Sequence, residues 1–123
     1  MNGNNLLIDS NIIILASKNK IDLASIIKNY KNIYFSIITY IEILGYSFDN
    51  EEEKKIILEV LNEFKIINLF SEIADIAIGY KKLKKIKLPD AVILATAKYL
   101  KADLITKDIK DFQNIDNSIN LIN

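Results

Sequence analysis

Short apolar runs alternate with longer amphipathic stretches along the chain, and this alternation restricts its fold more than any other feature. The short runs lie at residues 6–8, 33–35, 65–70, 104–105 and 119–122. Runs of this length, rich in β-branched and aromatic residues, are typical of buried strands. The stretches between them repeat apolar residues at helical spacing. The order β-α-β-α-β-α-β-β therefore predicts a parallel α/β sandwich with right-handed crossovers.

Capping residues indicate where several helices start. Asn50, with Glu53 three positions later, has the capping-box pattern, and Ser71 is expected to cap the next helix. Pro89 lies where a first helical turn should be. Further helices are predicted at residues 11–16, 22–28, 38–46 (closed by Gly45) and 90–100. The last of these is apolar almost all round, which predicts a helix buried in the middle of the fold.

The chain has the size and composition of one compact domain. It has 123 residues, half of them hydrophobic, with one proline and no repeat or low-complexity linker. We therefore expect a single domain over residues 1–123. The polar residues 1–5 and the short apolar run after them do not resemble a secretory signal, and no apolar stretch reaches membrane-spanning length. The expected location is the cytoplasm, with no membrane partner.

The residue types that are missing narrow the possible chemistry. The chain has no cysteine and no histidine, which excludes disulfides, thiolate or imidazole metal ligands and a histidine general base. Sixteen acidic residues balance sixteen basic ones, and every basic residue is lysine. Because the net charge is zero, the protein as a whole does not attract a nucleic acid, which would have to bind a local patch of positive charge.

Four acidic residues follow predicted strands or open the buried helix. They are Asp9, Glu42, Asp90 and Asp108. In open α/β sheets ligands bind beyond the carboxyl ends of the strands, so these positions are the first candidates for a functional site.

Each of these acids also has a structural interpretation. Asp9 could cap the helix after it, and Glu42 could complete a capping box with Thr39. Asp90 could be a favourable charge in a first helical turn, and Asp108 could be a turn residue.

The four acids together are harder to explain by structure alone. Three of them are flanked by strongly apolar sequence that draws them toward the interior, where grouped carboxylates repel one another. A hard divalent cation such as Mg²⁺ or Mn²⁺ prefers oxygen ligands and would neutralise them. It could also activate a water and stabilise charge on a phosphate oxygen, which would replace histidine chemistry.

Four blocks of sequence, each containing one of these acids, resemble a known family. They are residues 7–11, 38–43, 88–97 and 104–112. In this order and at this chain length they resemble the PIN domains, and among them the VapC-like toxins of type II toxin-antitoxin pairs. The resemblance covers nearly the whole chain. It implies a three-layer α/β/α sandwich with a five-stranded parallel sheet, bound Mg²⁺ or Mn²⁺, and endonucleolytic cleavage of RNA.

The resemblance also assigns roles to the four acids. The family's metal ligands correspond to Asp9, Glu42 and Asp90, with Asp108 as the fourth and more variable acid. We expect all four to be metal-binding and catalytic. Relatives pair as homodimers and are held inactive by a cognate antitoxin that covers the acidic groove, so the same partners are expected here.

Neighbouring polar residues correspond to supporting positions of the family. Ser10, Asn11 and Thr106 match positions that support the acids or their waters, although helix capping and turn formation explain them as well. Asp111 is expected to start a short helix with Phe112 packed inward, and it is the reserve candidate for the fourth acid.

Lysines are dense near two of the acids. Relatives often use arginine near the substrate, and this chain has none, so lysines would have to contact the phosphates. The candidates for RNA binding are Lys85, Lys87, Lys107 and Lys110. A lysine run is also typical of a solvated helix face. Tyr40 and Tyr46 could stack on bases, or fill a core or a dimer contact.

Two other functions compete with the nuclease. A receiver-like phosphoacceptor domain would use Asp9 to hold Mg²⁺ and Lys107 beyond a late strand, but it needs an aspartate after the third strand, and residues 65–70 are followed by Ser71 and Glu72. A non-catalytic PIN-like module would bind RNA or protein without cutting.

Overall fold

Five parallel strands form the centre of the molecule in the computed structural model, which describes residues 4–123. Their order across the sheet is β3-β2-β1-β4-β5. The strands are β1 (Asn5–Ile8), β2 (Asn32–Ser36), β3 (Lys65–Ile67), β4 (Asp103–Ile105) and β5 (Leu121–Ile122). The predicted parallel α/β sandwich with five strands is confirmed. Residues 1–3 of the predicted domain and of the polar N-terminal stretch lie outside the described residues.

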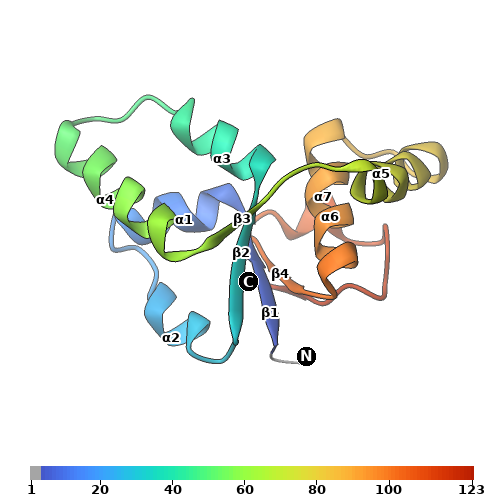
Figure 1. Cartoon of the computed structure of the whole chain (residues 1–123), viewed down its shortest axis with the longest axis horizontal. Helices are drawn as coiled ribbons and strands as arrows, with labels where there is room; N and C mark the ends of the chain where they lie inside the picture. The colour runs from blue at the N-terminus through green and yellow to red at the C-terminus, as the bar shows by residue number, and fades with distance from the viewer. Residues whose placement is uncertain (1–3) are drawn as a thin grey trace.

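Helices cover both faces of this sheet (Figure 1). One face carries α1 (Ser10–Ser17), α2 (Leu23–Ile27), α3 (Ile37–Leu44) and α4 (Glu51–Glu63). The other carries α5 (Ser71–Leu83), α6 (Leu88–Leu100) and α7 (Ile109–Phe112). Figure 1 shows the chain crossing from the first face to the second between β3 and α5. No helix within residues 4–123 is both long enough and apolar enough to cross a membrane.

Alternating side chains of β1 join the sheet to two separate cores. Leu6 and Ile8 pack with α1, α3 and α4, whereas Leu7 packs with α5 and α6. Residues 91–97 of α6 are all buried, as their apolar composition predicts. This helix starts at Leu88, and Pro89 lies in its first turn. Asp90 is thereby fixed at the end of a helix that lies against the sheet.

Several predicted boundaries differ from the structure. β3 ends at Ile67 and not at residue 70, because the chain must leave the sheet there to reach α5 on the opposite face. β5 contains two residues in place of the predicted four. Ser71 is the first residue of α5 and does not cap it; Phe70 holds the capping position without a side-chain hydrogen bond. The edge strands are therefore shorter than predicted, whereas β1, β2 and β4 extend one residue or two beyond their predicted bounds.

The capping box predicted at the start of α4 is only half formed. Glu53 N donates to Asn50 Oδ1 at 2.8 Å, so the expected N-cap is present. Glu53 Oε1 is buried and has no hydrogen-bond partner within residues 4–123. Glu53 Oε1 therefore does not accept the reciprocal hydrogen bond that completes a capping box.

Candidate metal-binding site

The candidate acids lie at the edge of the sheet where the strand order reverses. β1 is bonded to β2 on one side and to β4 on the other, so the chain segments after β1 and β4 lead to opposite faces. Crevices at such a switch point are the usual ligand sites of open α/β sheets. Asp9 follows β1, and Thr106 and Asp108 follow β4. The topology alone therefore brings residues about a hundred positions apart to one place.

Asp9 is at the centre of this edge and is only 6% exposed. Its Oδ1 accepts from Ser10 N at 2.9 Å, and its Oδ2 accepts from the fully buried Thr106 Oγ1 at 2.7 Å. Burial raises the pKa of Asp9 above its ordinary value; the two hydrogen bonds lower it, and the charges of Glu42 and Asp108 raise it further. Asp9 is thus the N-cap of α1, as the structural interpretation predicts, and also a buried carboxyl facing other acids.

Glu42 approaches from α3 and has no capping role. The N-cap of α3 is Ser36, whose Oγ accepts from Ile38 N at 3.0 Å. Thr39 is inside the helix, so the capping-box interpretation of Thr39 and Glu42 is wrong. The exposed Glu42 instead accepts through Oε1 from Ser10 Oγ at 3.1 Å.

Asp108 is held by two of the predicted supporting residues. Asn11 Nδ2 donates to Asp108 Oδ2 at 2.6 Å, and Asp108 N donates to Thr106 Oγ1 at 2.9 Å. Asp108 lies at the N-cap position of α7 and not in a separate turn, and its side chain makes no capping hydrogen bond to that helix. Asn11 Oδ1 is buried and has no hydrogen-bond partner within residues 4–123. This oxygen could accept from a water or ligand at the site.

Asp90 and Asp111 form the other side of the site. Burial raises the pKa of Asp90 from 3.8 to about 6; the negative charge of Asp111 contributes next, followed by those of Asp9 and Glu42, while Lys87 lowers it. Asp111 is the third residue of α7, which starts at Ile109, so the prediction that Asp111 starts this helix is wrong. Phe112 is buried, as predicted.

The sequence hypothesis treated Asp108 and Asp111 as alternatives, whereas the structure brings both to the site. Asp108 belongs with Asp9 through the hydrogen bonds of Asn11 and Thr106. Asp111 faces Asp90 across a groove. The three-residue spacing of the two aspartates is nearly one helical turn, which was the signal that both could face the same region.

Two observations bear on whether a divalent cation fits these acids. Asp9, Glu42, Asp90, Asp108 and Asp111 form no ion pair with a lysine within residues 4–123, so the nearest positive influence on them is the longer-range charge of Lys87 on Asp90. However, no three acidic side chains in this part of the chain are close enough to hold one ion directly. Mg²⁺ keeps several waters and commonly binds proteins through one or two carboxylates. The donor set therefore fits a partly hydrated ion better than a cage made only of carboxylates.

The candidate RNA-binding lysines occupy two neighbouring hollows. Lys85, Lys87 and Lys110 line a groove of about 450 Å³ together with Asp90 and Asp111. Lys107 lines the adjoining hollow with Asp108. Lys85 and Lys87 lie after the end of α5, in the loop before α6, so the predicted solvated helix face does not describe them.

The two tyrosines proposed for base stacking are engaged with other aromatic rings. Tyr40 is stacked with Phe35 at a centroid distance of 6.4 Å. Tyr46 meets Phe48 edge-on at 5.3 Å, and its hydroxyl accepts from Lys18 Nζ at 3.3 Å. The contacts of Tyr46 favour the structural interpretation, whereas Tyr40 is still partly exposed.

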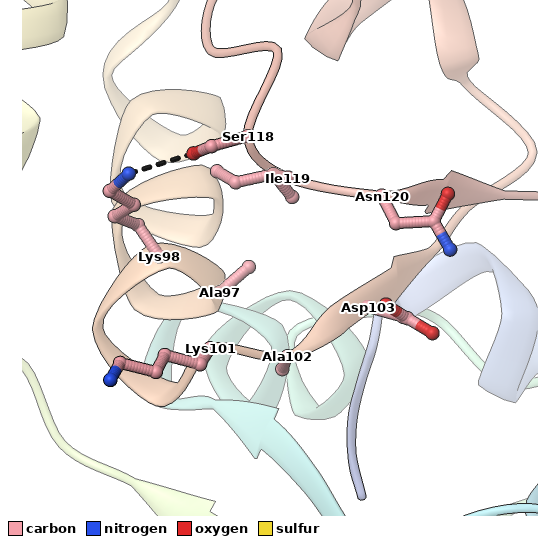
Figure 2. Close-up of a pocket in the computed structure, with 8 residues that line it drawn as sticks. All are labelled: Ala97, Lys98, Lys101, Ala102, Asp103, Ser118, Ile119 and Asn120. Atoms are coloured by element: carbon pink, nitrogen blue, oxygen red, sulfur yellow. Dashed lines mark hydrogen bonds between the residues drawn. The ribbon is translucent and has the colours of Figure 1, made fainter. Parts of the chain in front are cut away.

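A pocket of about 390 Å³ lies at the opposite end of the sheet. Figure 2 shows Lys98, Lys101 and Ser118 around it, with Ala102 and Asp103 at the start of β4. None of the predicted site residues lines it. It is therefore separate from the acidic edge, which lies beyond the strands' carboxyl ends.

Comparison with known proteins gives a family and a fold. The family model described as "PIN domain" matches residues 6–118. A chain of a toxin-antitoxin complex from Klebsiella pneumoniae is 29% identical, with a TM-score of 0.73 and 96% of each chain covered. No curated protein matches the sequence.

Two further solved structures are more distant in sequence and similar in fold. One is VapBC2 from Rickettsia felis, bound to a DNA fragment from its promoter: 22% identity, TM-score 0.78, with 95% of this chain and 96% of that chain covered. The other is DNA-bound VapBC from Salmonella typhimurium: 17% identity, TM-score 0.80 and the same coverage. At these identities the likeness concerns the fold.

Proposed function

The chain belongs to the PIN-domain family, and on this premise we propose that it is a metal-dependent endoribonuclease and the toxin of a toxin-antitoxin pair. One observation carries the proposal: Asp9, Glu42, Asp90 and Asp108 gather where the strand order reverses, and no lysine within residues 4–123 pairs with them. Grouped carboxylates in this position are stabilised by a hard cation.

The four acids would hold Mg²⁺ or Mn²⁺, in part through water. When bound, the ion supplies an activated water and neutralises charge on the scissile phosphate. The chain's own residues prepare the oxygens for this role. Thr106 Oγ1 donates a hydrogen bond to Asp9 Oδ2, Ser10 Oγ donates one to Glu42 Oε1, and Asn11 Nδ2 donates one to Asp108 Oδ2. Glu42 Oε2 and Asp108 Oδ1 accept no hydrogen bond within residues 4–123, whereas both oxygens of Asp9 already accept one, so Asp9 would use its remaining lone pairs for an ion or its water.

Cleavage of a structured RNA tests the proposal. With Mg²⁺ or Mn²⁺ at millimolar concentration we expect the parent to cut internal bonds, and a chelator to stop it. Asp9→Asn and Asp90→Asn should lose activity about 100-fold or more, since metal-assisted catalysis depends on these oxygens. Asp75→Asn on the exposed side of α5 is the matched control and should cut like the parent. Equal cleavage by all variants would refute the assignment of Asp9 and Asp90 as catalytic residues and indicate a contaminating nuclease.

The proposed partners are a cognate antitoxin protein and a second copy of the chain. Solved neighbours are described as toxin-antitoxin complexes, which supports the first. Co-expression with a small protein encoded beside the toxin should give a complex that suppresses cleavage, and light scattering of the purified chain should give twice its mass of 14.1 kDa. A monomer at micromolar concentration would reject the homodimer. The cytoplasmic location expected from the sequence stays a prediction.

A specific observation favours one second candidate, the non-catalytic PIN-like module. Within residues 4–123, no three acids are close enough to hold an ion directly. Such a module would bind RNA without cutting it at any metal concentration, which the cleavage assay separates from the nuclease. The receiver-like alternative is disfavoured by topology, because receiver domains have the strand order 2-1-3-4-5 and this sheet has the order 3-2-1-4-5.

A further inference from the structure

One groove beside the acids has the chemistry of a phosphate-binding surface. We call it the lysine groove; it is about 450 Å³ in volume and leads to Asp90. It is formed by the end of α5, the loop before α6, the first turn of α6, and α7. Its lining residues are Lys81, Lys85, Ile86, Lys87, Asp90, Lys110 and Asp111.

The loop that carries two of these lysines is fixed by the protein itself. Lys81 Nζ donates to Ile86 O at 2.7 Å, which ties the last turn of α5 to the loop. Ile86 is only 7% exposed and packs into the core formed with α5 and α6. Lys85 and Lys87, on either side of this anchored residue, are exposed. The groove therefore exists without a ligand, and binding need not order the loop.

The charges in the groove are not paired with one another. Lys85, Lys87 and Lys110 make no ion pair within 4.0 Å of an acid in residues 4–123, although Asp90 and Asp111 line the same groove. Lysines with nearby but unpaired acids leave their ammonium groups available for an external anion. Because Ile86 is the one apolar side chain in the lining, the groove suits an ionic backbone better than a peptide that needs apolar contacts.

Lysines are concentrated on one flank of the acids. The other flank is formed by α1 and α3, and neither helix contains a lysine; Lys18 lies at the C-cap of α1, at the opposite end of the helix from Asp9, and donates to Tyr46. A polyanion that reaches the acids is therefore attracted over α5, α6 and α7 and not over α1 and α3.

From these observations we infer that the lysine groove binds backbone phosphates of single-stranded RNA on one side of the bond to be cut. This inference rests on the proposed function, because it takes RNA as the ligand. The contacts are to phosphates, so binding is tolerant of sequence and depends on salt. Lys81 acts through the loop as a positioning residue, whereas Lys85, Lys87 and Lys110 contact the phosphates.

Binding can be measured apart from cleavage. The Asp9→Asn chain, with Mg²⁺ present, is titrated against a fluorescein-labelled 12-nucleotide single-stranded RNA at several salt concentrations. The groove variant adds Lys85→Gln, Lys87→Gln and Lys110→Gln. The control variant adds Lys28→Gln, Lys54→Gln and Lys55→Gln, which are exposed lysines outside the groove and change the net charge equally. Thermal unfolding of both variants checks that they fold.

The groove variant should bind RNA at least about tenfold more weakly near 0.1 M salt. The slope of log Kd against log salt should fall by about 2, because each phosphate contact to a single strand contributes about 0.7. The control should stay within about twofold of its parent by the same counting. Equal loss of affinity in both variants, or no RNA binding at all, overturns the inference.

A second probe separates RNA from an acidic protein segment. If the groove variant keeps its RNA affinity but loses binding to a 12-residue poly-glutamate peptide, the groove is a peptide site and the inference is wrong. Cleavage by the chain with intact Asp9 is scored independently. RNA that binds through the groove but is never cut would reject the proposed nuclease and leave the groove's role intact.

Discussion

Replacing Asp90 by asparagine should make the metal-free protein more stable at neutral pH. Burial and the charges of Asp111, Asp9 and Glu42 raise the pKa of Asp90 from 3.8 to about 6. The folded state therefore binds this proton more tightly than the unfolded chain. As the pH rises from about 4 to above 6, the folded state loses stability, because it must hold a carboxylate that it disfavours. Asparagine cannot ionise and avoids this loss.

The size of the effect follows from the raised pKa. A change from 3.8 to about 6 corresponds to about 3 kcal/mol at about 1.4 kcal/mol per tenfold change in proton affinity. Asp90 is only partly buried, so solvent screening reduces the expected destabilisation by its carboxylate to about 1 kcal/mol. We expect the free energy of unfolding of Asp90→Asn, relative to that of the parent, to be about 1 kcal/mol higher at pH 8 than at pH 4.

Urea unfolding in EDTA at pH 4, 6 and 8 measures this difference for the parent, Asp90→Asn and the exposed control Asp75→Asn. Using the difference between two pH values cancels any effect of the substitution that does not depend on charge. Addition of Mg²⁺ at ten times its Kd should then stabilise the parent by about 1.4 kcal/mol at pH 8, and Asp90→Asn by less. A relative stability that is the same at pH 4 and pH 8 would refute the electrostatic argument. A parent indifferent to Mg²⁺ would refute the metal site.

Three further variants test the packing around the site, each by urea unfolding at pH 7. Thr106→Val removes the hydrogen bond to Asp9 and should cost about 1–3 kcal/mol, while Thr106→Ser should cost clearly less; equal costs would mean that the hydroxyl is unimportant. Tyr80→Phe removes a 2.6 Å hydrogen bond to Asp116 and should cost about 1 kcal/mol, and an unchanged midpoint would contradict that bond. Leu104→Ala in the fully buried β4 should cost about 2–5 kcal/mol, and a cost below that of a surface change would argue against this core.

The sheet was predictable because its central strands β1 and β4 are buried on both faces. A strand covered on both sides must be apolar throughout, so residues 6–8 and 104–105 stand out from the amphipathic helices between them. The edge strands β3 and β5 were predicted too long, since apolar residues beyond their ends serve other purposes. Phe70, for example, leaves the sheet and packs against Tyr99 of α6 at a centroid distance of 4.9 Å.

The meeting of Asp9 and Asp108 was predictable for a similar reason. Both follow central parallel strands, and the carboxyl ends of adjacent parallel strands lie at one edge. The position of Asp111 beside Asp90 was not predictable from that rule. It depends on how the single turn of α7 lies against the start of α6, which is a matter of tertiary packing and not of local pattern. The hydrogen bond between Asn11 and Asp108 also depends on tertiary packing and could not be predicted, although Asn11 was predicted as a supporting residue of the site.

The acids of the site divide into those that accept a hydrogen bond from a side chain and those that accept none. Asp9, Glu42 and Asp108 each accept a hydrogen bond from a neutral hydroxyl or amide side chain, which fixes an oxygen without cancelling its charge. Asp90 and Asp111 accept no side-chain hydrogen bond within residues 4–123.

Neutral donors would be a poor choice if the purpose were stability alone, since lysine partners would neutralise the charge. Under the proposed function they would fix the oxygens while leaving their negative charge for a cation. Asp90 and Asp111 line the lysine groove, so under the proposed function these two carboxylates lie on the side of the site from which a phosphate would approach. The acids without a side-chain donor and the lysines of the groove therefore lie on the same side of the site and form one electrostatic arrangement.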